Sequence, residues 1–361
     1  MARVETVREI REILVALANR FAFREIAFLV GCGATGLALS QREVARVQQL
    51  CAYGQRLFDL DTEDYDNPDA ALGANTDTRI VDLVEGEFVP RHLVERGRRC
   101  QFRQDPHERP RGALLSLYPA YELFLELIAA RWERREMMGV IVGAFLAAEY
   151  APLLAWQQVL GHAGDPLEMA KDPAFAGPQS HWGRYDATKC PHTKPQRSAA
   201  SRALRVIDEP PSGWRSYLDR QHSIVSHALG ICAGDCKAPC TVMGALGDGD
   251  RVHISEACRL ALAYRSSALI RLRHTAPTGH GFGVPSPAEV TEAWRRTRES
   301  IARRGGIGVA AMTDDGFVLP GLPSLFSAIA GHPLHPDTLL HDTASELVRQ
   351  LDPDELTTAP A

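Results

Sequence analysis

The sequence predicts a mainly α-helical, multi-helix globular fold with a small C-terminal β-hairpin and a Cys/His-rich irregular insert. Apolar residues recur at helical spacing in both halves of the chain, and serine-based capping boxes at Ser40 and Ser286 mark two helix starts. Five of the eight cysteines lie between Cys190 and Cys258. With 45% hydrophobic and 24% charged residues among 361, the composition is that of an ordinary globular protein.

The N-terminal part is expected to contain two helices. Residues 3–30 carry apolar side chains three or four positions apart: Val7, Ile10, Leu14 and Leu17. Ser40 and Glu43 form the capping box of a second helix that runs to about Leu57. The first fourteen residues mix charges with apolar positions and do not form the continuous apolar core of a signal peptide. We therefore expect a cytoplasmic protein whose cysteines are thiols or ligands and do not form a disulfide framework.

The strongest core signal lies in the middle of the chain. A helix is expected over Ala113–Glu136, and a very apolar helix over Met137–Leu160 follows it closely, so the two should pack as an antiparallel hairpin. The second helix approaches the length needed to span a bilayer, but Glu149 and Pro152 interrupt it. We expect a buried core helix and no membrane contact, with Glu149 paired or in a polar cavity.

Three further helices are expected toward the C-terminus. They cover Ile254–Leu272, a segment that begins after Ser286 and ends at Gly305-Gly306, and Pro336–Leu351.

The β-hairpin is expected directly after the second of these helices. Ile307–Met312 and Phe317–Leu319 are separated by Thr-Asp-Asp-Gly, and Asp-Gly favours a tight hairpin turn.

Three regions follow from this pattern. They are an N-terminal helical region (1–175), the Cys/His-rich insert (176–250) and a C-terminal helical region with the hairpin (251–361), and they can pack as one domain.

The insert carries the chemistry-bearing residues. Cys232, Cys236 and Cys240 are spaced so that a turn containing Gly234 and Pro239 could bring three sulfurs to one metal ion. Cys190, which precedes a proline, is the first choice for a fourth ligand, with His227 and Cys258 in reserve.

The cysteine spacing does not identify the metal. An iron-sulfur cluster, structural zinc and a redox-active pair of Cys232 with Cys236 are all compatible with it. The same spacing also fits one face of a helix whose cysteines are small buried hydrophobes.

Histidines and carboxylates suggest a catalytic pocket beside this metal. Asp219, His222 and His227 precede the cysteines, and Asp219 and His222 share a helical face. We expect them to be proton-transfer groups, or ligands of a non-haem metal. Additional residues are singled out for these roles: Glu122, Glu126 and Glu149 as further metal ligands, and Arg184, Arg220 and Lys237 for an anionic substrate.

Haem is kept as an alternative cofactor. The helix expected to end at His274 and the glycine-rich segment Thr278–Gly283 resemble the proximal helix and glycine loop of the indoleamine dioxygenase superfamily. No histidine stands at the matching point near Ala268, so membership of that family is not inferred.

Two weaker motifs point to other classes. Gly31–Gly36 satisfies the dinucleotide-binding pattern G-x-G-x-x-G, but the expected neighbours are helices, so no cofactor-binding residues are assigned there. The arginine-rich helix that includes Arg295, followed by a hairpin, has the order of a recognition helix and wing. A net charge of −5 argues against nucleic acid as the main partner.

The function expected is a metal-dependent (iron-sulfur or other iron) oxidoreductase acting on a small molecule, with an electron donor as partner and a homo-oligomer as an open alternative. The alternatives are a haem-dependent oxygenase and a zinc-stabilised or redox-sensing regulatory or DNA-binding protein.

Overall fold

The structure, a computed structural model, describes residues 2–33, 36–62, 88–100, 116–160, 230, 233, 246–275 and 283–351. Within these ranges the regular structure is helical and no β-strand occurs, which confirms the mainly α class. The chain divides into two compact units. Unit 1 joins Met1–Phe102 to Asp337–Ala361, and unit 2 comprises Arg103–Pro336. The division into three regions stays a prediction.

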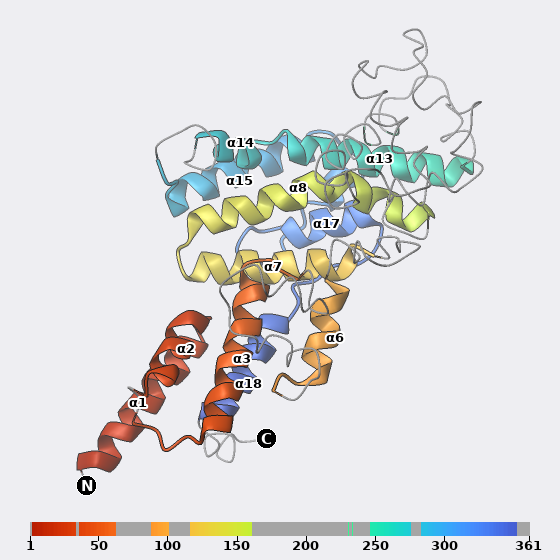
Figure 1. Cartoon of the computed structure of the whole chain (residues 1–361). Helices are drawn as coiled ribbons and strands as arrows, with labels where there is room; N and C mark the ends of the chain where they lie inside the picture. The colour runs from red at the N-terminus through yellow and green to blue at the C-terminus, as the bar shows by residue number, and fades with distance from the viewer. Residues whose placement is uncertain are drawn as a thin grey trace, which may run out of the picture. The chain divides into compact units, whose positions relative to one another are not determined.

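Unit 1 is built on helix α3, which packs against α2 and α18, while α1 also packs on α18 (Figure 1). The helices of the unit are α1 (Ala2–Ala18), α2 (Phe23–Gly31), α3 (Gln41–Phe58), α6 (Arg91–Arg99) and α18 (Leu339–Leu351). The predicted capping box is present: the Ser40 hydroxyl accepts from the Glu43 amide, and the Glu43 carboxylate accepts from the Ser40 amide. The sequence prediction of the α3 start is therefore confirmed.

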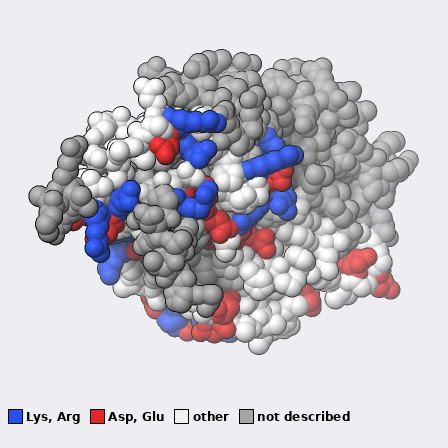
Figure 2. All heavy atoms as spheres, turned by 90° about the horizontal axis from the view of Figure 1, so that it is seen from below, with Lys and Arg blue, Asp and Glu red and all other residues white. Residues whose placement is uncertain are grey.

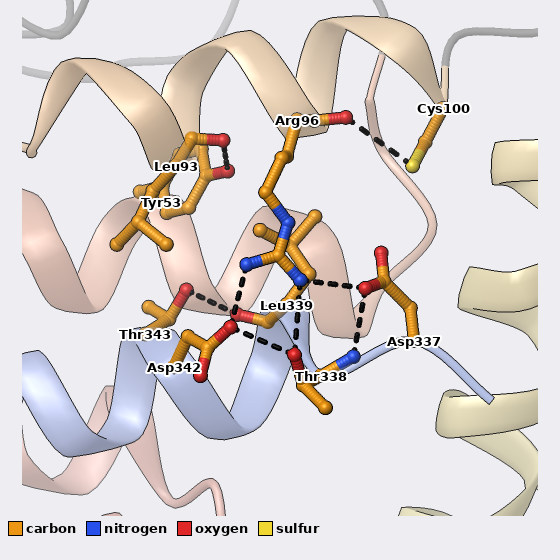
Figure 3. A network of polar contacts seen from close by, with 9 residues as sticks. All are labelled: Tyr53, Leu93, Arg96, Cys100, Asp337, Thr338, Leu339, Asp342 and Thr343. Carbon is orange, nitrogen blue, oxygen red and sulfur yellow. Dashed lines mark hydrogen bonds and ion pairs between the residues drawn. The ribbon is translucent and has the colours of Figure 1, made fainter.

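Helix α6 was missed by the sequence analysis, because it buries only Leu93, Val94 and Gly97 and is otherwise basic. A polar network fixes it instead (Figure 3). The Arg96 guanidinium donates to Asp342 at 2.5 Å and to Asp337 at 2.6 Å. Burial alone would lower the pKa of Arg96, but these two carboxylates raise it. The arginine therefore stays charged and ties α6 to the start of α18.

Unit 2 is arranged around α8, which contacts α7, α13, α14, α15 and α17 (Figure 1). Its helices are α7 (Tyr118–Glu133), α8 (Met137–Leu160), α13 (Asp248–Arg265), α14 (Ala268–Thr275), α15 (Pro287–Ala302), α16 (Ile307–Ala310) and α17 (Leu322–Ala330). The expected helix over Ile254–Leu272 is thus two helices, which are separated at Ser266 and Ser267. The capping box at Ser286 is present as predicted.

The α7–α8 pair is the antiparallel hairpin that the sequence predicts. The Tyr121 hydroxyl on α7 donates to the Ala147 carbonyl of α8 at 2.6 Å, and the Leu117 amide at the start of α7 donates to Gln157 near the end of α8. Helix α13 is joined to α8 in the same way, because the Tyr264 hydroxyl of α13 donates to the Ala144 carbonyl of α8 at 3.0 Å. Two buried phenols therefore fix α7 and α13 on the central helix.

By length and composition alone, the span Met137–Gln158 of α8 could cross a membrane, but 61% of it is buried inside the protein. Its one acidic residue, Glu149, forms an ion pair with Arg265 at 3.1 Å, and both side chains are largely buried. The expectation that Glu149 needs a partner is confirmed. These features are those of a core helix in a helical unit.

The predicted β-hairpin is wrong. Residues 307–310 form α16, and residues 313–319 are irregular. The Asp-Gly sequence serves another purpose, because the Asp315 carboxylate accepts from the amides of Gly321 and Ser324 and from the Ser324 hydroxyl. These groups lie at the N-terminus of α17, whose unpaired amides and dipole favour a negative charge.

Replacing Asp315 should therefore weaken unit 2. We expect Asp315→Ala to lower the free energy of unfolding by about 1–2 kcal/mol, as loss of a helix cap typically does. Asp314→Ala is the matched control, because among the described residues Asp314 accepts only from the local Gly316 amide, and it should cost less. Urea unfolding followed by tryptophan fluorescence measures both, since Trp156 and Trp294 are buried in unit 2. Equal effects of the two variants would contradict the capping role.

Candidate functional site

A cluster of polar side chains lies where four helices of unit 2 meet. Helix α7 begins there with Tyr118, α8 approaches its end at Gln158, α13 contributes His253 from its first turns, and α17 ends beside His332. We call these four side chains the helix-end cluster. They come from distant parts of the sequence, so the packing of α8 brings them together.

Gly331 is the centre of the helix-end cluster. It caps α17 in the left-handed conformation, with φ of 62°, which favours glycine. A Cβ atom there would collide with Gln158 Oε1 and would lie 2.8 Å from His253 Nε2. Only glycine permits this approach, and the two polar atoms therefore converge on the same point of the backbone.

His253 is the unusual member of the cluster. Its Nε2 atom is buried and has no hydrogen-bond partner within the described part of the chain. Buried polar atoms are almost always paired with protein, water or an ion, so an unpaired imidazole nitrogen needs an explanation. The sequence analysis assigns no role to His253.

Tyr118 and His332 form the outer side of the cluster. Their rings stack with centroids 4.5 Å apart and planes at 11°. Burial raises the pKa of Tyr118, so its phenol is neutral near pH 7. Sequence reasoning missed both residues, although the Gly331-His332 pair directly after an apolar helix was a detectable signal of a capped helix end.

The residues that the sequence predicts as the metal site lie outside the described ranges. These are the ligands Cys190, Cys232, Cys236 and Cys240 and the proton-transfer residues Asp219, His222 and His227. Between residues 161 and 245 the structure describes only Gly230 and Ala233. Gly230 and Ala233 are helical and buried, and a Cβ at Gly230 would contact Leu262 of α13 and Pro152 of α8.

The remaining candidate ligands are placed as follows. Cys258, the reserve ligand, is fully buried in α13, and burial raises the pKa of its thiol, so it is a core residue. Glu149 is engaged by Arg265, and Glu126 is buried on α7. His274, considered for haem, is exposed at the end of α14. No group of three His, Cys, Asp or Glu side chains with metal-binding spacing occurs among the described residues.

Two weaker motifs lack the structural context that they need. The segment before Gly31 is helix α2 and not a strand, so the glycine motif is not part of a Rossmann unit. On α15, Arg295 and Arg296 both pair with Glu292, whose pKa these hydrogen bonds lower to about 2. Residues 307–319 form α16 and an irregular segment, so the β-hairpin wing of a DNA-binding motif is absent there.

Charge on the described surface is mixed. On the face drawn in Figure 2, basic side chains lie among acidic ones.

Comparisons of the chain with protein-family models, with curated proteins and with solved structures found no match. The residues and their geometry are therefore the basis of a functional proposal.

The buried acids of unit 2 predict loss of stability at high pH. Burial raises the pKa of Cys258, Tyr121 and Tyr264 in the folded protein. Their stabilising contribution is complete below the unfolded pKa values, about 8.5 for cysteine and about 10 for tyrosine, and is lost as pH rises above them. Each group should lower the free energy of unfolding by about 1.4 kcal/mol per pH unit in that window.

The Tyr264→Phe variant tests this expectation. It removes one ionisable group, so the slope between pH 10 and 11, in the range of a tyrosine titration, should be shallower than in the unchanged chain. Urea midpoints at a series of pH values measure the slope. An unchanged slope would mean that Tyr264 ionises as readily in the folded state.

Proposed function

We propose that the protein is a metal-dependent oxidoreductase acting on a small molecule, in which Cys232, Cys236, Cys240 and Cys190 bind an iron-sulfur cluster. The observation that carries the proposal is the C-x3-C-x3-C sequence with Gly234 and Pro239 inside it. Three thiolates close together in a turn-rich segment suit iron-sulfur clusters and zinc, because several sulfurs must reach one metal centre.

The cysteines that the structure describes are less suited to bind a metal than those of the insert, which supports the choice of ligands. Cys51 and Cys258 are buried, and burial raises the pKa of both thiols, which disfavours the thiolate that a metal needs. Cys100 is buried and its thiol donates to the Arg96 carbonyl. Cys32 is exposed at the end of α2 in unit 1. The cysteines of the insert thus remain the candidate ligands.

The attachment of the insert gives further support. Gly230 lies against α8 and α13, and Ala233 is 3% exposed, so two residues beside Cys232 in the sequence are buried in unit 2. A helix at these two residues also fits the alternative in which Cys232 and its neighbours are ordinary core residues. Metal content decides between the two.

In the proposed enzyme the cluster would supply electron transfer, and an external electron donor or acceptor would balance the reaction. His222, His227 and Asp219 would transfer protons to and from the substrate. Arg184, Arg220 and Lys237 are the cations available to an anionic substrate. The chain's own groups would thus provide binding and proton transfer around a redox centre.

Anaerobically purified protein should be brown, with broad absorption beyond the protein band and iron and sulfide in similar amounts. Cys236→Ala should abolish the colour, because a cluster needs all of its thiolates. Cys32→Ser is the matched control, since Cys32 is exposed and lies outside the insert, and it should keep the colour. Circular dichroism checks that both variants fold.

Other outcomes identify the alternatives. Colourless protein that contains zinc would replace the redox proposal with a structural or regulatory site, and a sharp Soret band would indicate haem. Colourless protein without metal would contradict the proposal.

A further inference from the structure

The helix-end cluster contains an unexplained polar atom and suitable neighbours for it. His253 Nε2 is buried without a hydrogen-bond partner among the described residues, and Gln158 Oε1 approaches the same glycine backbone. His332 directly follows that glycine and stacks on Tyr118. His253 Nε2 and Gln158 Oε1 therefore approach each other at Gly331, and His332 is the next residue along the chain.

These donors are of the kind that first-row transition metals prefer. Neutral imidazole nitrogen suits Zn²⁺, Co²⁺ and Ni²⁺, and an amide oxygen can complete such a set with water. The setting also favours a cation, because α17 ends at Ala330 and its last carbonyls carry partial negative charge.

The cluster is accessible from solvent. His332 and Gln158 are exposed, whereas His253 is partly buried. The Gln158 amide is a flexible side chain, so it can move aside to open His253 Nε2 or turn its oxygen toward an ion. Gly331 keeps the backbone from blocking the approach, since a Cβ atom there would lie 2.8 Å from His253 Nε2.

We propose that His253 and His332, assisted by Gln158, bind a divalent first-row transition-metal ion at the helix-end cluster. This site uses no cysteine and does not depend on the redox function proposed above. A water molecule that joins His253 Nε2 to Gln158 is the competing explanation, because it would satisfy the same atoms.

The test is Co²⁺ binding to the full chain, measured by equilibrium dialysis and absorption under anaerobic conditions. We expect His253→Ala and His332→Ala each to remove about one equivalent of Co²⁺ that binds through nitrogen and oxygen. His274→Ala is the matched control, since His274 is an exposed histidine of unit 2 outside the cluster, and it should keep that equivalent.

A second measurement keeps the test valid if a variant folds poorly. Zn²⁺ should raise the unfolding temperature of the unchanged chain, because a ligand that binds the folded state stabilises it. Gln158→Ala should reduce this increase. Identical cobalt binding by the unchanged chain and His253→Ala, or equal losses in His274→Ala, would overturn the proposal and leave the bridging water as the explanation.

The outcome is separable from that of the cysteine site. Sulfur-bound Co²⁺ gives strong charge-transfer absorption that histidine and amide ligands do not give. Loss of that absorption in Cys236→Ala reports on the cysteine site, whereas loss of the nitrogen-bound equivalent in His253→Ala reports on the helix-end cluster.

Discussion

The polar groups on helix α8 are the constraint on which unit 2 depends. Apolar burial drives the other helices onto α8, but burial alone permits many registers. Tyr121 and Tyr264 each bring a hydroxyl to a backbone carbonyl of α8, and Arg265 brings a guanidinium to Glu149. A buried polar group without its partner costs about 1–3 kcal/mol, so a shift of α7 or α13 along α8 would be penalised at several points at once. The apolar surface supplies the driving force, and these three side chains select one arrangement.

The features that could be predicted from the sequence were those that depend on residues close together in the chain. The capping boxes at Ser40 and Ser286 were recognised because both partners lie within four residues, and the apolar α8 was recognised because its whole length repeats one signal. The hairpin prediction failed because Asp315 bonds to groups up to nine residues later, which a turn motif does not encode. Helix α6 was missed because its stability comes from Arg96 and carboxylates more than two hundred residues away. Local hydrogen bonds can be read from a sequence, whereas contacts between distant segments require the fold.

The same distinction applies to function. The cysteine spacing around Cys236 is a local pattern, so the sequence alone proposes a metal site there. The helix-end cluster is a product of packing, because His253 meets Gln158 and Gly331 only when α13 and α17 pack on α8. No spacing rule connects residues 158, 253 and 331. Two candidate metal sites of different ligand chemistry, one of sulfur and one of nitrogen and oxygen, therefore emerge from two different kinds of evidence.

The antiparallel packing of α8 and α13 brings the end of one helix close to the start of the other. Gln158, near the end of α8, and His253, near the start of α13, both lie beside Gly331, so these two helix ends are close together. Closing a loop between two ends that are already held together costs little more for a long loop than for a short one, about 0.6 kcal/mol for each doubling of length. A large segment can therefore be accommodated between these helices without disturbing the polar anchors of α8. An ion bound by His253 would therefore be held where α8 ends and α13 begins.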